Sequence, residues 1–184
     1  MATSKQHALI RDRLLQLLAP AMPGIQVQVG TSRKWRRTRL TFRHASFADL
    51  LPEQRFRRIL QRIPNDFYEQ YLRGAVWFEL APGETEEDAL RAPRSEDVAD
   101  QEPRIARALL KAGFFDALEE AMGPDPLDSG SADFQVSRKL LEERGVTGDD
   151  QRDACLVFIR QGAYCDYEVL QVAGPALIEQ YGRK

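Results

Sequence analysis

The sequence predicts an α+β protein: an N-terminal unit with the order helix, strand, strand, helix, helix, strand, followed by a small all-helical domain. Three segments before residue 82 are rich in β-branched and aromatic residues, which suit a pleated sheet. Elsewhere, apolar residues recur at helical spacing. An acidic, proline-containing segment at 84–103 predicts a linker. The predicted domains are therefore 1–83 and 104–184.

The first three predicted elements are a helix and two strands joined as a hairpin. Ser4 can cap a helix whose apolar residues lie on one side, and this helix ends near two prolines at 20 and 23. In GIQVQVG, apolar residues alternate with glutamines, which predicts a strand with one solvated face. The link 30–37 is short enough for a hairpin into RTRLTFR. There Leu40 and Phe42 share one face of a half-buried strand.

Two helices and a third strand complete the N-terminal unit. Pro52 suits a first helical turn, and the apolar residues that follow it recur at spacings of three and four up to Ile63. Pro64 ends this helix. A second short helix ends before Gly74, where the positive φ of a helix terminus costs glycine little. AVWFELA then predicts a strand that ends at Pro82.

The C-terminal part predicts helices throughout. RIARALLKAGFFDALEEAM indicates one helix that ends at Gly123. Ser131 or Asp133 is available to cap the next helix, FQVSRKLLEERG. A third helix is expected from Asp149 or Asp150 to about residue 162, and a last one follows Asp166 with an interruption at 174–175.

Composition places the chain among ordinary globular proteins. It has 184 residues, of which 43% are hydrophobic and 29% charged, enough for a real core. No window approaches the roughly 20 apolar residues that span a bilayer, and the N-terminal residues do not resemble a secretory leader. We therefore expect a cytoplasmic protein without membrane association, in which Cys155 and Cys165 stay reduced.

Charge is distributed unequally along the chain. Residues 1–74 carry 14 lysines and arginines against 5 acidic residues, and residues 75–184 carry 12 against 23. Such a split indicates a basic surface for an anionic partner, or two halves of one protein that attract each other. The sequence leaves both interpretations open.

The basic residues gather in two places of the N-terminal unit. Four lie in the predicted hairpin connection, beside Trp35, and three lie on one side of the helix after Pro52. The candidate binding residues are Arg33, Lys34, Arg36, Arg37, Arg55, Arg58 and Arg62. Phosphate contacts from such a surface would give salt-dependent, largely sequence-independent binding of nucleic acid. The alternative is a solvated helix face paired with carboxylates.

A family resemblance covers roughly residues 5–83. LTFRHASFADLLPEQRFRRILQRI is similar to the strand, loop and arginine-rich helix of the BolA-like fold, which is related to type II KH domains. AVWFELAPGE is similar to the last strand of that fold. The resemblance implies a BolA-like unit. BolA proteins use a histidine before or within the last strand to hold an iron–sulfur cluster with a glutaredoxin. The corresponding YLRGAVWF contains no histidine, so we expect no cofactor. The GxxG loop of KH domains is also absent, so we do not expect that family's mode of RNA clamping.

A second resemblance covers roughly residues 135–173. LVFIRQGAYCDYEVLQVAG is similar to a small bacterial domain family of unknown function that carries a C-D-C-E-V-L motif. Here the motif is Cys165, Asp166, Tyr167 and Glu168, followed by Val-Leu. The resemblance implies no activity. The structural interpretation is that Asp166 caps a helix and Glu168 lies in its first turn, where negative charge is favoured.

Two hypotheses about function follow. The first is a non-enzymatic binding or adaptor protein that uses its basic N-terminal face toward nucleic acid or an acidic protein surface. The second is a thiol- or metal-dependent regulatory or catalytic site around Cys155 and Cys165. A zinc site needs four ligands, usually in close pairs, and nucleophilic catalysis needs an oriented base. With two histidines in distant segments, the sequence favours an enzyme least.

Overall fold

The computed structural model describes residues 4–123 and 133–182. The chain divides into two compact units, Met1–Ala92 and Pro93–Lys184, called unit 1 and unit 2 below. Their boundary falls inside the segment 84–103 for which the sequence predicts a linker. Within the described ranges, no helix has both the length and the apolar character needed to cross a membrane.

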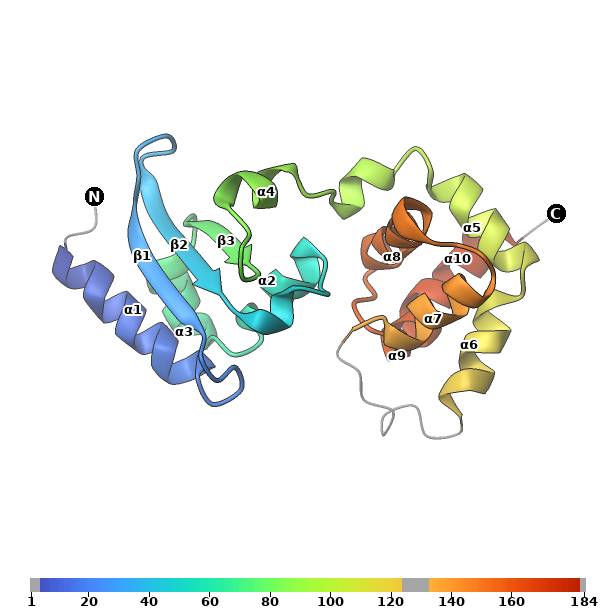
Figure 1. Ribbon diagram of the computed structural model, residues 1–184, viewed down its shortest axis with the longest axis horizontal. Coiled ribbons are helices and arrows are strands. Elements are labelled where there is room, and N and C mark those ends of the chain that lie inside the picture. The colour runs from blue at the N-terminus through green and yellow to red at the C-terminus, as the bar shows by residue number, and fades with distance from the viewer. Residues whose placement is uncertain (1–3, 124–132, 183–184) are drawn as a thin grey trace. The chain divides into compact units, whose positions relative to one another are not determined.

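Unit 1 combines helices with a three-stranded mixed sheet, which confirms the predicted α+β class (Figure 1). Strand β2 is central, antiparallel to β1 and parallel to β3, so Leu40 lies opposite both Val29 and Trp77. In chain order the elements are α1 (Ser4–Leu18), β1 (Gln26–Ser32), β2 (Arg37–Arg43), η1 (Ala45–Phe47), α2 (Pro52–Leu60), α3 (Asn65–Phe67), η2 (Tyr68–Leu72), β3 (Val76–Leu80) and α4 (Glu86–Arg91).

The core of unit 1 lies on the sheet face that carries Leu40 and Phe42, both fully buried as the alternation predicts. Trp77 of β3 stacks on Phe42 with ring centroids 5.2 Å apart, and Phe56 of α2 meets Trp77 edge to face at the same separation. Helix α1 adds three buried residues at helical spacing, Ile10, Leu14 and Leu18. The apolar sides of α1 and α2 therefore pack on this face of the sheet and cover it.

The chain that follows β3 is also part of unit 1. Thr85 begins α4 with a reciprocal cap: its hydroxyl accepts from the Asp88 N–H at 3.2 Å, and the Asp88 carboxylate accepts from the Thr85 N–H at 2.8 Å. Glu86 then accepts a hydrogen bond from the Thr41 hydroxyl at 3.2 Å and pairs with Arg39 at 3.4 Å. Part of the predicted acidic linker is therefore packed on the sheet.

Unit 2 is helical in all its described regular elements. These are η3 (Ser95–Val98), α5 (Glu102–Lys111), α6 (Phe114–Met122), α7 (Gln135–Glu143), α8 (Gly148–Arg160), α9 (Asp166–Glu168), η4 (Val169–Ala173) and α10 (Gly174–Tyr181). Helix α8 is buried from Ala154 to Ile159. Its Phe158 stacks on Phe114 at 5.6 Å and meets Phe134 at 5.8 Å, so three segments of unit 2 share one aromatic core.

The single helix predicted from residue 104 to 122 is wrong. Gly113 takes a left-handed conformation, with φ 60°, and divides the segment into α5 and α6. The apolar pattern does not reveal this break, because it continues across Gly113: Leu109 is buried before the glycine, and Phe114 and Phe115 are buried after it. The glycine itself was the local signal.

Candidate anion-binding surface

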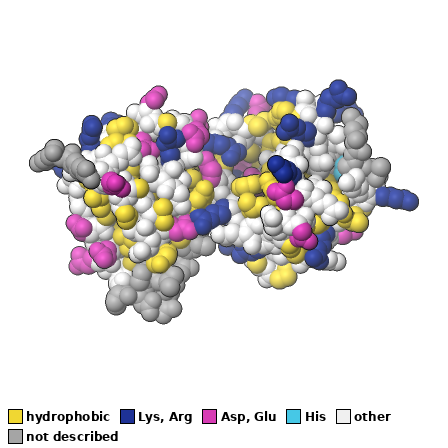
Figure 2. All heavy atoms as spheres, turned by 180° about the vertical axis from the view of Figure 1, so that it is seen from behind, with side chains coloured by type: hydrophobic (Ala, Val, Ile, Leu, Met, Phe, Trp, Pro, Cys, Tyr) yellow, Lys and Arg dark blue, Asp and Glu magenta, His cyan; other side chains and the backbone are white. Residues whose placement is uncertain are grey.

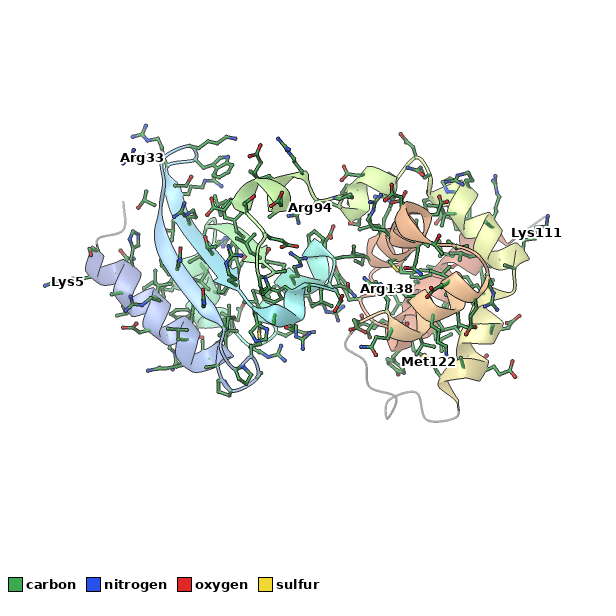
Figure 3. The ribbon with its side chains drawn as sticks, viewed as in Figure 1. Lys5, Arg33, Arg94, Lys111, Met122 and Arg138 are labelled. Atoms are coloured by element: carbon green, nitrogen blue, oxygen red, sulfur yellow. The ribbon has the colours of Figure 1, made fainter. Side chains whose placement is uncertain are left out.

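The loop that joins β1 to β2 and the first residue of β2 together carry four of the predicted basic residues. The exposed side chains of the loop and of the first residue of β2 are Arg33, Lys34, Trp35, Arg36 and Arg37. Arg33 lies at the tip of the hairpin (Figure 3), and Figure 2 shows Lys and Arg side chains gathered at this end of unit 1. We call the four basic residues the hairpin cations. Within the described ranges, none of them pairs with a carboxylate.

Trp35 places an aromatic ring among the hairpin cations. It remains 37% exposed, and the Lys34 Nζ lies 4.9 Å from its centroid, within cation–π range. The ring also lies 6.2 Å from Phe78 of β3, and the Trp35 backbone N–H donates to the Ser32 hydroxyl at 3.3 Å. The indole is therefore positioned by the sheet and by the start of the loop, and more than a third of its surface remains exposed.

A pocket of about 260 Å³ opens beside the loop end of the same hairpin. Two segments that are distant in sequence line it, because the parallel pairing of Arg39 with Val76 brings the start of β3 beside the start of β2. The lining residues are Thr31, Arg36, Arg37, Thr38, Tyr71, Arg73, Gly74 and Ala75. Three arginines and three residues with hydroxyl groups thus line one small volume, and no carboxylate is among the lining residues. We call it the arginine pocket.

Arg73 is a functional candidate that the sequence analysis missed. It pairs with Glu69 at 2.8 Å, one turn earlier in the chain, and both side chains are largely exposed, 74% and 46%. An exposed pair of this kind contributes about 0.3–0.5 kcal/mol, so Arg73 can leave Glu69 at small cost. Gly74, with φ 75°, turns the chain into β3 here. The sequence predicts the turn at Gly74, which places Arg73 just before β3. It does not predict the parallel pairing of β3 with β2, which brings Arg73 beside the hairpin.

Arg55 does not belong to the exposed surface. It is only 8% exposed, since its guanidinium donates to the carbonyl oxygens of Leu50 at 2.8 Å and Glu79 at 2.9 Å. It also forms a bidentate pair with Glu84, with distances of 2.5 and 2.9 Å. These hydrogen bonds hold the pKa of Glu84 below its ordinary value. Arg55 therefore ties α2 to the end of β3.

Arg58 and Arg62 do not join the hairpin cations either. Both are half-buried in the last turn of α2 and beyond, and the Arg62 guanidinium donates to the Arg58 carbonyl oxygen at 2.5 Å. Arginine often satisfies the last carbonyls of a helix in this way. Neither residue lines the arginine pocket, so the predicted set of seven separates into a hairpin group and a helix group.

The charge split of the sequence is partly resolved inside unit 1. Glu84 and Glu86, the first carboxylates of the acidic segment after Pro82, pair with Arg55 and Arg39 respectively. This is the intramolecular attraction that the sequence left open, realised for two arginines. Among the described residues this pairing does not extend to the hairpin cations, whose charges face solvent.

The Cys-Asp-Tyr-Glu motif holds two segments of unit 2 together. The buried Asp166 carboxylate accepts hydrogen bonds from the backbone N–H groups of Val136 and Ser137, both at 2.8 Å. It therefore caps α7, whereas the sequence predicted a cap on its own helix; the N-cap residue of α9 is Cys165. Glu168 accepts from the Tyr164 N–H at 2.8 Å, and Tyr167 is half-buried. Ser131, one predicted cap of α7, lies outside the described residues.

Cys155 and Cys165 do not form a reactive pair. Cys155 is fully buried in α8 and Cys165 is half-buried, and neither forms a disulfide in the described chain. Burial raises the pKa of Cys155 to about 11, so the nucleophilic thiolate is scarce at neutral pH. In residues 4–123 and 133–182, no group of three His, Cys, Asp or Glu side chains is placed to hold a metal ion.

We expect Cys155 to resist alkylation in the native protein at pH 8 and to react only on unfolding, because its thiol is both buried and protonated. Mass spectrometry of iodoacetamide-treated protein, with and without urea, would measure labelling at each cysteine separately. Cys165, which is half-buried, serves as the internal comparison. Labelling of Cys155 in native protein as fast as in urea would contradict this prediction.

Similarity to known proteins does not assign a function to this surface. Comparison of the chain with protein-family models, with curated proteins and with solved structures found no match.

Proposed function

We propose that this protein is a non-enzymatic binding protein that contacts single-stranded nucleic acid through the hairpin end of unit 1. The observation that carries the proposal is the exposed Trp35 ring among the hairpin cations, with Lys34 above it at 4.9 Å. A nucleic acid offers both groups that this surface can bind, a phosphate backbone and flat bases. An acidic protein surface would engage the cations and leave the indole without a matched group.

The mode of binding follows from the two kinds of side chain. The hairpin cations would neutralise phosphates and release counterions, which makes the affinity depend on salt but little on sequence. Trp35 would stack on an unpaired base, an interaction worth about 1–3 kcal/mol. Bases inside a duplex have no free face, so the proposal favours single strands.

The order of elements in unit 1 supports a BolA-like or KH-related assignment as part of the same proposal. Helix α1 precedes the β1–β2 hairpin, the helical segments η1, α2, α3 and η2 follow, and β3 adds parallel to β2. We do not extend the assignment to cluster binding, because the segment from Tyr71 to Phe78 has no histidine. The thiol alternative gains no support from a buried Cys155 whose pKa is raised.

Fluorescence anisotropy with labelled single- and double-stranded oligonucleotides between about 50 and 200 mM salt would test the proposal. Removing two hairpin charges with R33Q/K34Q should weaken binding about tenfold at about 100 mM salt and reduce the salt slope by about 1.4, near 0.7 for each lost phosphate contact. W35A should weaken binding to single strands by about 5-fold or more.

The matched control is K5Q/R13Q, which removes one lysine and one arginine from exposed positions on α1. It should bind as the unchanged protein does, because α1 does not contribute to the hairpin surface. Absence of binding at about 50 mM salt, where phosphate contacts are strongest in this series, would refute the proposed function and direct attention to an acidic protein partner. An equal loss in both double variants would show only general charge attraction, which also counts against it.

A further inference from the structure

We propose that the arginine pocket binds a phosphate monoester, presented by the phosphorylated end of a nucleic-acid strand. The inference rests on the proposed function and adds to it a specificity for strand ends. Arg33, Lys34 and Trp35 would contact backbone phosphates and a base. The pocket beside them, which Arg36 and Arg37 line, would hold the terminal phosphate.

The charge of the pocket fits a dianion. Arg36 and Arg37 come from the hairpin and Arg73 from the turn before β3, and no carboxylate is among the lining residues. A phosphate monoester carries about −1.5 to −2 charges at pH 7, against about −1 for a backbone diester. Guanidinium groups bind phosphate oxygens in bidentate fashion, so three of them can engage the three free oxygens of a monoester.

The size and the neutral lining also fit a small anion. The volume of about 260 Å³ is below the roughly 300–1,000 Å³ of pockets for drug-sized ligands. Thr31, Thr38 and Tyr71 supply hydroxyls, each of which can donate a hydrogen bond to an oxygen. Gly74 also lines the pocket, and a Cβ added there would meet no heavy atom within 4 Å apart from its chain neighbours. A phosphate group can therefore approach the backbone there.

In the described chain, Glu69 is the acidic side chain that pairs with Arg73, and it would compete only weakly with a phosphate. Its ion pair with Glu69 is exposed on both sides, so solvent screens it. A dianion held by two further arginines offers more attraction than a single carboxylate. We expect Arg73 to exchange Glu69 for the phosphate on binding.

The backbone at Arg36 is a further sign that its side chain matters. Arg36 is the one non-glycine residue of the described chain with a positive φ, 54°, a conformation that is unfavourable for an ordinary residue and costs glycine almost nothing. Glycine would satisfy this turn better, yet the position carries a guanidinium that lines the pocket. Arg36→Gly therefore removes the charge without harming the fold.

The test compares one oligonucleotide with three ends: 5′-phosphate, 3′-phosphate and hydroxyl at both ends. Anisotropy at about 100 mM salt should show about tenfold tighter binding of a phosphorylated form, the gain expected from one added charge-assisted contact. R36G and R73Q should each remove that preference. R91Q is the matched control, because Arg91 also closes an exposed pair with a glutamate one turn earlier but lies outside the pocket.

A second arm titrates inorganic phosphate into the protein at constant ionic strength and follows arginine Nε–Hε signals by NMR. Saturable shifts of Arg36, Arg37 and Arg73 that are lost in R73Q would support a phosphate pocket. If these shifts appear but no oligonucleotide binds, the proposed function fails, and the pocket is assigned to a free phosphate monoester. Equal affinity for the three oligonucleotides would overturn the end specificity while the proposed function stands. Absence of saturable shifts together with equal affinity would overturn the pocket itself.

Discussion

Arg55→Met is expected to lower the free energy of unfolding of unit 1 by about 3 kcal/mol. The arginine is 8% exposed and satisfies the carbonyl oxygens of Leu50 and Glu79 together with the carboxylate of Glu84. Methionine fills a similar volume but takes the guanidinium donors away from the two carbonyl oxygens and from Glu84, which among the described residues keeps only the Ala81 N–H at 2.8 Å. Removal of one partner from a buried ion pair typically costs about 3–5 kcal/mol. The partial exposure of Glu84 places the effect at the lower end.

Urea unfolding followed by tryptophan fluorescence would measure this loss in unit 1 specifically. The chain has two tryptophans, and both Trp35 and Trp77 lie in unit 1. Arg11→Met is the control, because Arg11 is exposed and pairs only with its neighbour Asp12 in the described chain; it should change stability by less than about 0.5 kcal/mol. A loss below about 1 kcal/mol for Arg55→Met, well under the cost of breaking a buried pair, would contradict the assigned role.

The same pair predicts the response of unit 1 to acid. Hydrogen bonds from Arg55 hold the pKa of Glu84 below its ordinary value, so the folded state favours the carboxylate more than the unfolded state does. The resulting stabilisation is complete above the unfolded pKa and is lost as the pH falls through the folded pKa. Arg55→Met should therefore flatten the loss of stability between about pH 5 and about pH 3 relative to the unchanged protein. Urea midpoints measured across this pH range would check it, and parallel profiles for the two proteins would contradict it.

Arg55 also shows where sequence patterns stop being informative. Its neighbours on α2 predicted a basic stripe, because helical spacing places Arg55, Arg58 and Arg62 on one side. Arg55 is buried because it pairs with Glu84, 29 residues later. The spacing of residues within one helix cannot predict such a distant partner. The apolar strand residues Leu40 and Phe42 were predictable because burial of alternate residues is a local property.

The segment after Pro82 is a second case in which a distant partner decides the structure. It has few apolar residues, and Leu90 is 57% exposed, so composition indicated a linker. What holds α4 on the sheet is polar: the Glu86 contacts with Arg39 and Thr41. For the site, the hairpin cations were predictable from one contiguous run, whereas Arg73 required the parallel pairing of β2 with β3, which joins segments through a helical connection.

Asp166→Ala is expected to destabilise the start of α7 by about 3 kcal/mol. Each oxygen of this 1% exposed carboxylate accepts one backbone N–H of the first turn, from Val136 and Ser137. Hydrogen bonds to a charged group are worth about 1.5–3 kcal/mol each, and alanine would leave two donors unsatisfied in the interior. Because the capping carboxylate comes from 30 residues further along the chain, its loss should also free α9 from α7.

Hydrogen exchange measured by mass spectrometry would localise this effect, since unit 2 contains neither Trp35 nor Trp77. Peptides covering 136–141 should exchange about 100-fold faster in Asp166→Ala, the factor that corresponds to about 3 kcal/mol, while peptides covering β1 and β2 keep their rates. Asp149→Ala is the matched control: Asp149 also lies in the first turn of a helix, α8, but its side chain is 87% exposed. Unchanged exchange in α7 would mean that Asp166 does not hold these two segments together, and the motif would again need a functional explanation.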